Sequence, residues 1–188
     1  IEEISVLKTR IKELEQSESR SKRSEEALQE KTHALDERVK ELNCLYGLSK
    51  ATERPDISLP ETFEGSVNII PPGWQHPEVT CVRLVFENQT FKTSNFNETI
   101  WKQSSPILVD GRSVGTLEVY YLEEKPECDE GPFLKEERDL LDALAGQLGK
   151  TIQRKRAEKA LSEQRLWLDS ILNSMAVPVF YKDLNGAF

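Results

Sequence analysis

The chain has 188 residues, of which 37% are hydrophobic and 31% charged, and its net charge is −8 at pH 7. This acidic balance excludes a protein that coats nucleic acid or an anionic membrane over its whole length, and no apolar run approaches the roughly 20 residues of a membrane span. The three cysteines include no CxxC pair, which favours reduced thiols in the cytoplasm over disulfides or a zinc site. The first residue is Ile1 and no signal peptide is visible, so we expect a piece of a longer protein.

Charge is distributed unevenly along the chain. Residues 1–49 contain 20 charged side chains, residues 74–122 contain nine, and residues 134–170 contain 15. The prolines all lie between Pro55 and Pro132, apart from Pro178. Because proline breaks helix interiors, this pattern predicts long helices in both charged flanks and a different fold between them.

The first flank, residues 1–52, has a seven-residue apolar repeat that is typical of a coiled coil. Its polar positions cluster at the centre, which is either an ordinary interruption or a local switch. A helix with so narrow a stripe needs a partner, so we predict a linker helix that forms a homodimer. The predicted seam residues of this flank are Ile4, Leu7, Ile11, Leu14, Leu28, Leu35, Val39 and Leu42.

The middle, residues 53–149, is predicted to be one α+β domain with a small antiparallel sheet. Ser58 and Glu61 have capping-box spacing and predict a helix that runs to about Ile70. Alternating, β-branched segments predict strands at 79–86, 90–93, 103–109 and 113–122. An Asp110-Gly111 pair separates the last two strands and predicts a tight hairpin. The last helix of the domain begins near residue 134.

The second flank continues that helix as a connector over residues 150–174. Apolar residues up to Ile152 form a broad stripe suited to cover a sheet, whereas Leu161 and Leu168 are seven residues apart and predict a second dimer seam. Residues 22–30 and 155–163 are identical at six of nine positions. This repeat indicates either two connectors of the same kind or a chance similarity between charged helices.

Two segments resemble known families. Residues 105–152 are similar to the C-terminal half of a GAF domain, in which a glycine-containing hairpin leads into an F-x-x-E-E helix. The matching residues are Ile107, Gly111, Gly115, Leu117, Glu118, Val119, Phe133, Glu136 and Glu137. Residues 167–188 resemble the start of a PAS domain, so residues 175–188 would be its truncated N-terminal strand. The matching residues there are Leu168, Ile171, Leu172, Met175, Pro178, Val179, Phe180, Asp183, Gly186 and Phe188.

These resemblances imply a sensory, dimerisation and signal-relay fragment of a cytoplasmic multidomain sensor. The helices resemble the linkers between GAF and PAS modules of bacterial sensor histidine kinases, which implies downstream PAS and kinase domains, ATP-dependent autophosphorylation and a two-component phosphorelay. Two alternatives stay open: a structural spacer that binds nothing, and the same module from a diguanylate cyclase.

The sequence shows no catalytic constellation, metal site or evident cofactor. His33 and His76 lie outside the contexts expected of a phosphoacceptor or a haem ligand. An unknown small-molecule ligand remains open, because GAF-like domains often have a pocket beside the sheet. The residues expected to line it are Trp74, Cys81, Arg83, Trp101 and Tyr120. The alternative is that these side chains pack in the core and at its rim.

Overall fold

The computed structural model describes residues 2–54 and 57–174, except for the side chains of residues 2–9, 11–15, 30 and 33. Residues 175–188, the predicted start of a PAS domain, lie outside the described residues. The helices are α1 (Glu2–Thr52), α2 (Leu59–Ile69) and α3 (Lys135–Ser174), with short 3-10 turns η1 (Pro71–Gly73) and η2 (Pro77–Val79). The strands are β1 (Thr80–Phe86), β2 (Gln89–Lys92), β3 (Lys102–Val109) and β4 (Arg112–Tyr121).

The strands form one antiparallel sheet in the order β2-β1-β4-β3, which confirms the predicted mixture of helices and a small antiparallel sheet. The predicted hairpin joins β3 to β4, and both turn residues have positive φ, +50° at Asp110 and +76° at Gly111. That combination suits a type I′ turn, which Asp-Gly favours. The capping box of α2 is also present, with Ser58 and Glu61 bonding each other reciprocally.

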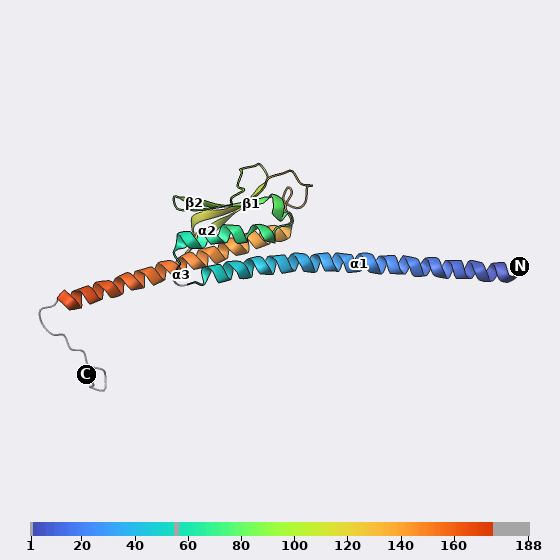
Figure 1. Ribbon diagram of the computed structural model, residues 1–188, viewed down its shortest axis with the longest axis horizontal. Coiled ribbons are helices and arrows are strands. Elements are labelled where there is room, and N and C mark those ends of the chain that lie inside the picture. Colours follow the sequence, from blue (N-terminus) through green and yellow to red (C-terminus); the bar gives the residue numbers. More distant parts are fainter. Residues whose placement is uncertain (1, 55–56, 175–188) are drawn as a thin grey trace, which may run out of the picture.

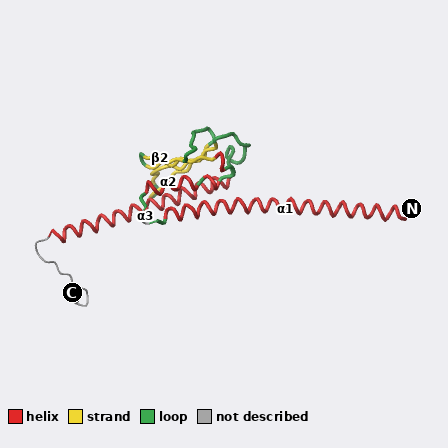
Figure 2. Tube along the Cα trace, viewed as in Figure 1, coloured by secondary structure: helices red, strands yellow, loops and turns green. Residues whose placement is uncertain are grey.

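The helices form two layers on one face of the sheet. Helix α2 covers β1 and β2, α3 lies along β3, and α1 packs beneath α2 and α3 on the side away from the sheet (Figures 1 and 2). Alternate strand residues meet the helices and form the core. Core side chains include Leu48, Phe63, Leu84, Leu117, Leu141 and Leu144.

Helix α3 lies very close to the sheet at Gly149. A Cβ atom built on Gly149 would overlap the carbonyl oxygen of Leu108 in β3. Only glycine permits this approach, which lets the helix backbone rest on the edge strand. The buried residues of α3 end at Ile152, and from residue 156 to residue 170 every side chain is exposed. One continuous helix therefore packs on the domain and then leaves it (Figure 1).

Candidate functional site

A polar cluster on the outer face of the sheet, opposite the helices, surrounds Arg83. Arg83 and Glu118 are paired residues of β1 and β4, so their side chains share this face. The Arg83 Nε donates to Glu118 at 2.5 Å, and its Nη2 donates to the Tyr120 hydroxyl at 2.6 Å. Tyr120 in turn donates to Glu118 at 3.0 Å. These three residues form a closed set of hydrogen bonds.

The loop between β2 and β3, residues 93–101, covers this cluster. Its Glu98 carboxylate accepts two hydrogen bonds from Arg83, at 3.0 Å from Nη1 and 3.3 Å from Nη2. The Phe96 ring lies 5.4 Å from the Arg83 guanidinium and packs edge-on against Tyr120. The Cys81 thiol approaches the Asn97 carbonyl at 3.6 Å. The loop thus provides Arg83 with a second carboxylate and an aromatic cover.

The environment fixes the protonation states of Arg83 and Tyr120. The hydrogen bond to Glu118 raises the pKa of Arg83, so the guanidinium is charged at every physiological pH. Burial, and then the hydrogen bond to Glu118, raise the pKa of Tyr120, so its hydroxyl stays neutral. Neither group can exchange a proton near neutral pH. The arrangement therefore suits the binding of charged groups better than acid–base catalysis.

The structure brings together three of the five predicted pocket residues and separates the other two. Cys81, Arg83 and Tyr120 share the outer face, whereas Trp74 is fully buried in the helix-side core and Trp101 packs against that core. Hydrophobic burial explains this placement, because a large indole gains most by leaving water for the apolar core. The sheet therefore separates Trp74 from the Arg83 cluster, whereas Trp101, at the end of the covering loop, packs toward the helix-side core.

Three residues of the cluster, Glu118, Glu98 and Phe96, are not among the predicted site residues, although Glu118 matches the GAF hairpin. Glu118 could have been found from strand alternation, since it is two residues from Tyr120 and must share its face. Glu98 and Phe96 lie in an irregular loop without a periodic pattern, so their approach to Arg83 depends on tertiary structure.

A second polar cluster lies where α3 leaves the domain. We call residues Gln153, Arg154, Lys155 and Arg156 the exit collar. Arg154 donates to the Thr52 carbonyl, and Lys155 donates to the Arg54 carbonyl at 3.0 Å. These carbonyls lie at and just beyond the C-terminus of α1, where cations are favourable because the helix dipole is negative there. The exit collar therefore ties the end of α1 to α3.

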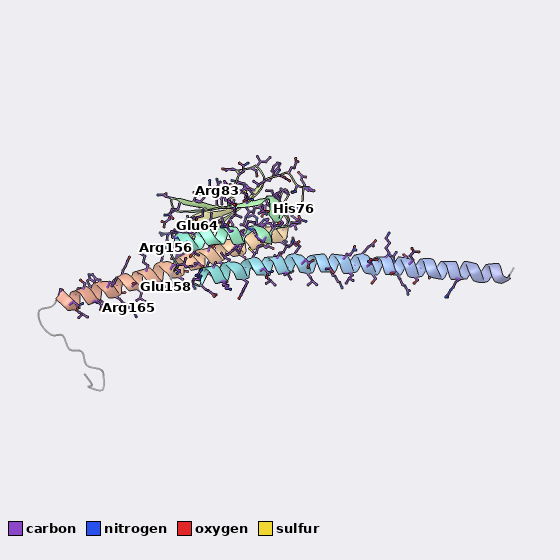
Figure 3. All side chains as sticks on the ribbon, in the orientation of Figure 1. Glu64, His76, Arg83, Arg156, Glu158 and Arg165 are labelled. Carbon is purple, nitrogen blue, oxygen red and sulfur yellow. The ribbon has the colours of Figure 1, made fainter. Side chains whose placement is uncertain are left out.

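The other two collar residues reach the sheet. Gln153 donates to Asp110 in the β3–β4 turn at 2.7 Å. Arg156 pairs with Glu87 in the β1–β2 turn at 2.8 Å and lies over the Phe86 ring at 5.8 Å. Figure 3 shows Arg156 at the point where α3 passes the end of the sheet. Four consecutive residues thus contact both sheet turns and α1.

The predicted dimer seam residues with described side chains are exposed in the single chain. In α1, the exposed fraction is 66% for Leu28 and 63% for Leu42, and in α3 it is 55% for Leu161. The remaining exposed members are Leu35, Val39 and Leu168. The side chains of Ile4, Leu7, Ile11 and Leu14 lie outside the described residues. Tyr46 extends the exposed stripe of α1 toward the domain.

A cavity of about 610 Å³ lies between α1 and the start of α3. Its wall includes five carboxylates and the cations Arg38 and Lys135, so it is acidic on balance. Within residues 2–54 and 57–174, no group of three or more His, Cys, Asp or Glu side chains is placed to hold a metal ion. No helix in that part of the chain combines the length and apolar character needed to cross a membrane.

No family model matches the sequence, and a search of curated proteins also gives no match. The features of the molecule that point to a function are the two polar clusters and the exposed stripes.

Proposed function

We propose that this chain is a homodimeric sensory and signal-relay module, GAF-like in kind, from a cytoplasmic multidomain sensor such as a histidine kinase. The observation that carries this proposal is a pair of exposed apolar stripes, one on the helix that enters the domain and one on the helix that leaves it. In this proposal autophosphorylation and phosphorelay belong to other domains of the parent protein.

The stripe of α1 points away from the domain. Cys44 and Leu48 are buried and mark the side of α1 that packs on the domain. Leu42 and Tyr46 precede them by two residues each and are exposed. Because an α-helix turns about 100° per residue, two residues rotate the direction by about 200°. The apolar stripe is thus nearly opposite the domain, where a second chain has access to it.

The stripe of α3 turns to the same side. Ile152 is buried under the sheet, and Leu161 follows nine residues later, a rotation of about 180° after complete turns. Leu168, seven residues on, points within about 20° of Leu161. The α3 stripe therefore points away from the sheet, which is also where α1 lies (Figure 1). Both stripes suit one parallel dimer with a two-fold axis beside the helices.

The exit collar supports the relay part of the proposal. It connects α3 to the end of α1 and to both sheet turns. A shift of the sheet relative to α1 has to stretch these contacts or carry α3 with it. A relay requires two packing states that an input favours unequally, and rotation of α3 would change the seam that Leu161 and Leu168 present downstream.

The dimer is tested by sedimentation of the chain at tens of micromolar. We expect a dimer for the native sequence and a monomer for Leu42→Glu, because a buried seam carboxylate is costly. The matched control is Leu108→Glu, which changes an exposed leucine of β3 (50% exposed) outside the stripe and should leave the dimer intact. A native chain that is monomeric at this concentration contradicts the proposal.

The relay is tested by pulsed electron paramagnetic resonance, which measures the distance between spin labels on Ser162→Cys in the two chains of a dimer. The exposed native thiol is removed by Cys128→Ser. Removing two collar contacts with Arg154→Ala and Arg156→Ala should shift or broaden the distance distribution between the labels. The control Arg165→Ala alters an exposed arginine farther along α3 (Figure 3) and should not. A distribution unchanged by the collar variants would favour the spacer alternative.

A further inference from the structure

We propose that Arg83 is the anion-binding residue of an input site whose resting occupant is the chain's own Glu98. A small organic carboxylate or phosphate would displace Glu98 from the guanidinium and release the loop of residues 93–101. This inference rests on the proposed relay function for its consequence, but the binding site itself stands on the geometry of the outer face.

The two carboxylates on Arg83 are held very differently. The Glu118 side chain is 12% exposed, belongs to β4 and also bonds Tyr120. The Glu98 side chain is 60% exposed and belongs to the covering loop. Glu118 is thus a fixed counter-ion, while Glu98 approaches from solvent. Exposed ion pairs are weak because water and salt screen them, so an external anion can replace Glu98 at little cost.

The guanidinium presents to Glu98 the geometry that oxyanions prefer. Nη1 and Nη2 donate to the two oxygens of Glu98 at 3.0 and 3.3 Å. This fork matches a carboxylate or a phosphate equally well. Glu98 therefore occupies the position in which a ligand oxyanion would make the same two hydrogen bonds.

The charges around the site favour an anion once Glu98 withdraws. Lys102 lies 3.9 Å from Glu118, and Lys92 lies 5.5 Å from the Phe96 ring that covers Arg83. Without Glu98, the cations Arg83, Lys102 and Lys92 outnumber the carboxylate of Glu118 in this cluster. This local excess of positive charge, in a chain of net charge −8, attracts a small anion.

The loop is connected to α3 through two hydrogen bonds. Thr99, at the end of the loop, donates to the Tyr121 carbonyl at 2.8 Å. The Tyr121 hydroxyl donates to Glu137 in the first turn of α3, also at 2.8 Å. Displacement of Glu98 therefore acts on a segment bonded to the residue that holds the start of α3, which gives the site a route to the relay helix.

The test is calorimetric titration of the full chain with citrate and, separately, with inorganic phosphate at low salt. Glu98→Gln removes the internal competitor and should bind at least one probe ten-fold or more tightly than the native chain. The matched control is Glu87→Gln, which removes the same charge from a side chain 61% exposed and paired with Arg156. It should bind as the native chain does. Citrate binding alone indicates a carboxylate ligand, and phosphate binding alone a phosphate ligand.

The double variant Arg83→Gln/Glu118→Gln removes the buried pair together, so no unpaired charge is left, and it should lose binding while remaining folded by circular dichroism. Three results overturn the proposal: no saturable binding to Glu98→Gln, equal gains in Glu98→Gln and Glu87→Gln, or binding that persists in the folded double variant. Sedimentation of Glu98→Gln separates the two proposals, because a monomer that binds the probe refutes the dimer alone.

Discussion

Glu137→Ala should lower the free energy of unfolding more than the removal of a neighbouring carboxylate does. Glu137 is 4% exposed, and its carboxylate accepts hydrogen bonds from three donors. These are the Tyr121 hydroxyl at 2.8 Å, the Gln75 backbone N–H at 2.7 Å and the Leu134 backbone N–H at 2.8 Å. The residue therefore joins β4, the segment after η1 and the N-terminus of α3.

The magnitude follows from the donors that Glu137→Ala leaves behind. The Tyr121 hydroxyl is fully buried, and an orphaned buried donor costs about 1–3 kcal/mol. The backbone groups of Gln75 and Leu134 belong to half-buried residues and regain water in part, so each costs roughly 0.5–1.5 kcal/mol. The free energy of unfolding should fall by about 4 kcal/mol, within a range of about 2–6 kcal/mol.

Urea unfolding followed by tryptophan fluorescence at one protein concentration measures this loss. With a slope of about 2 kcal/mol per molar urea, the midpoint should fall by roughly 1–3 M. Glu136→Ala is the matched control, because Glu136 is an exposed carboxylate in the same helical turn and should cost only about 0.3–1 kcal/mol through the helix dipole.

Tyr121→Phe should cost about 1 kcal/mol alone and less than that in the Glu137→Ala background, because the lost bond is shared. Equal midpoint shifts in Glu137→Ala and Glu136→Ala would refute the hydrogen-bond reasoning.

Three further outcomes are expected. Gly149→Ala should lower the melting temperature, at a cost of about 1–3 kcal/mol from overlap with the β3 backbone, whereas Gly146→Ala, with open space around its Cβ position, should raise stability by about 0.5–1 kcal/mol. The ion pair with Arg138 lowers the pKa of Glu130 below its ordinary 4.5, so the unfolded chain takes up that proton first. The free energy of unfolding should therefore decrease as the pH drops below about 4.5, and it should decrease less in Glu130→Gln than in the native chain. The two decreases should differ by under about 1 kcal/mol, because the ion pair is half-exposed. Urea midpoints measured at a series of acid pH values give this difference. Burial raises the pKa of the Cys44 and Cys81 thiols, whereas Cys128 is exposed. A disulfide reagent at pH 8 should therefore modify only Cys128 rapidly. Rapid modification of two or three thiols per chain would contradict the fold.

Local signals in the sequence predicted the elements of the fold accurately. The capping box at Ser58 and the Asp110-Gly111 pair specify backbone geometry through neighbours within a few residues, and both have the predicted conformation. Strand boundaries differ by one residue, as at Gln89, where β2 begins one residue earlier than predicted. These features do not depend on distant parts of the chain.

The candidate site was predicted only in part, because its contacts join distant segments. Residue type predicted Arg83 and Tyr120 as site residues, and they lie together because β1 pairs with β4. Residue type also predicted Trp74, which lies in the core, since it does not say which face of the sheet a loop side chain reaches. The partner of Arg156, Glu87, is 69 residues away, and no periodicity connects them.

The two ends of the domain-bound segment of α3 are held by polar contacts, and its middle by apolar ones. Glu137 fixes the start, Arg156 and its collar neighbours fix the end, and Leu141, Leu144 and Leu148 pack between them. A close-packed interior resists gradual deformation, so this segment of about 20 residues should move as a rigid rod of roughly 30 Å. A displacement at Tyr121 would then be carried whole to the exit collar. Any rotation would appear in the exposed stripe beyond Ile152 rather than be absorbed as a bend within the domain.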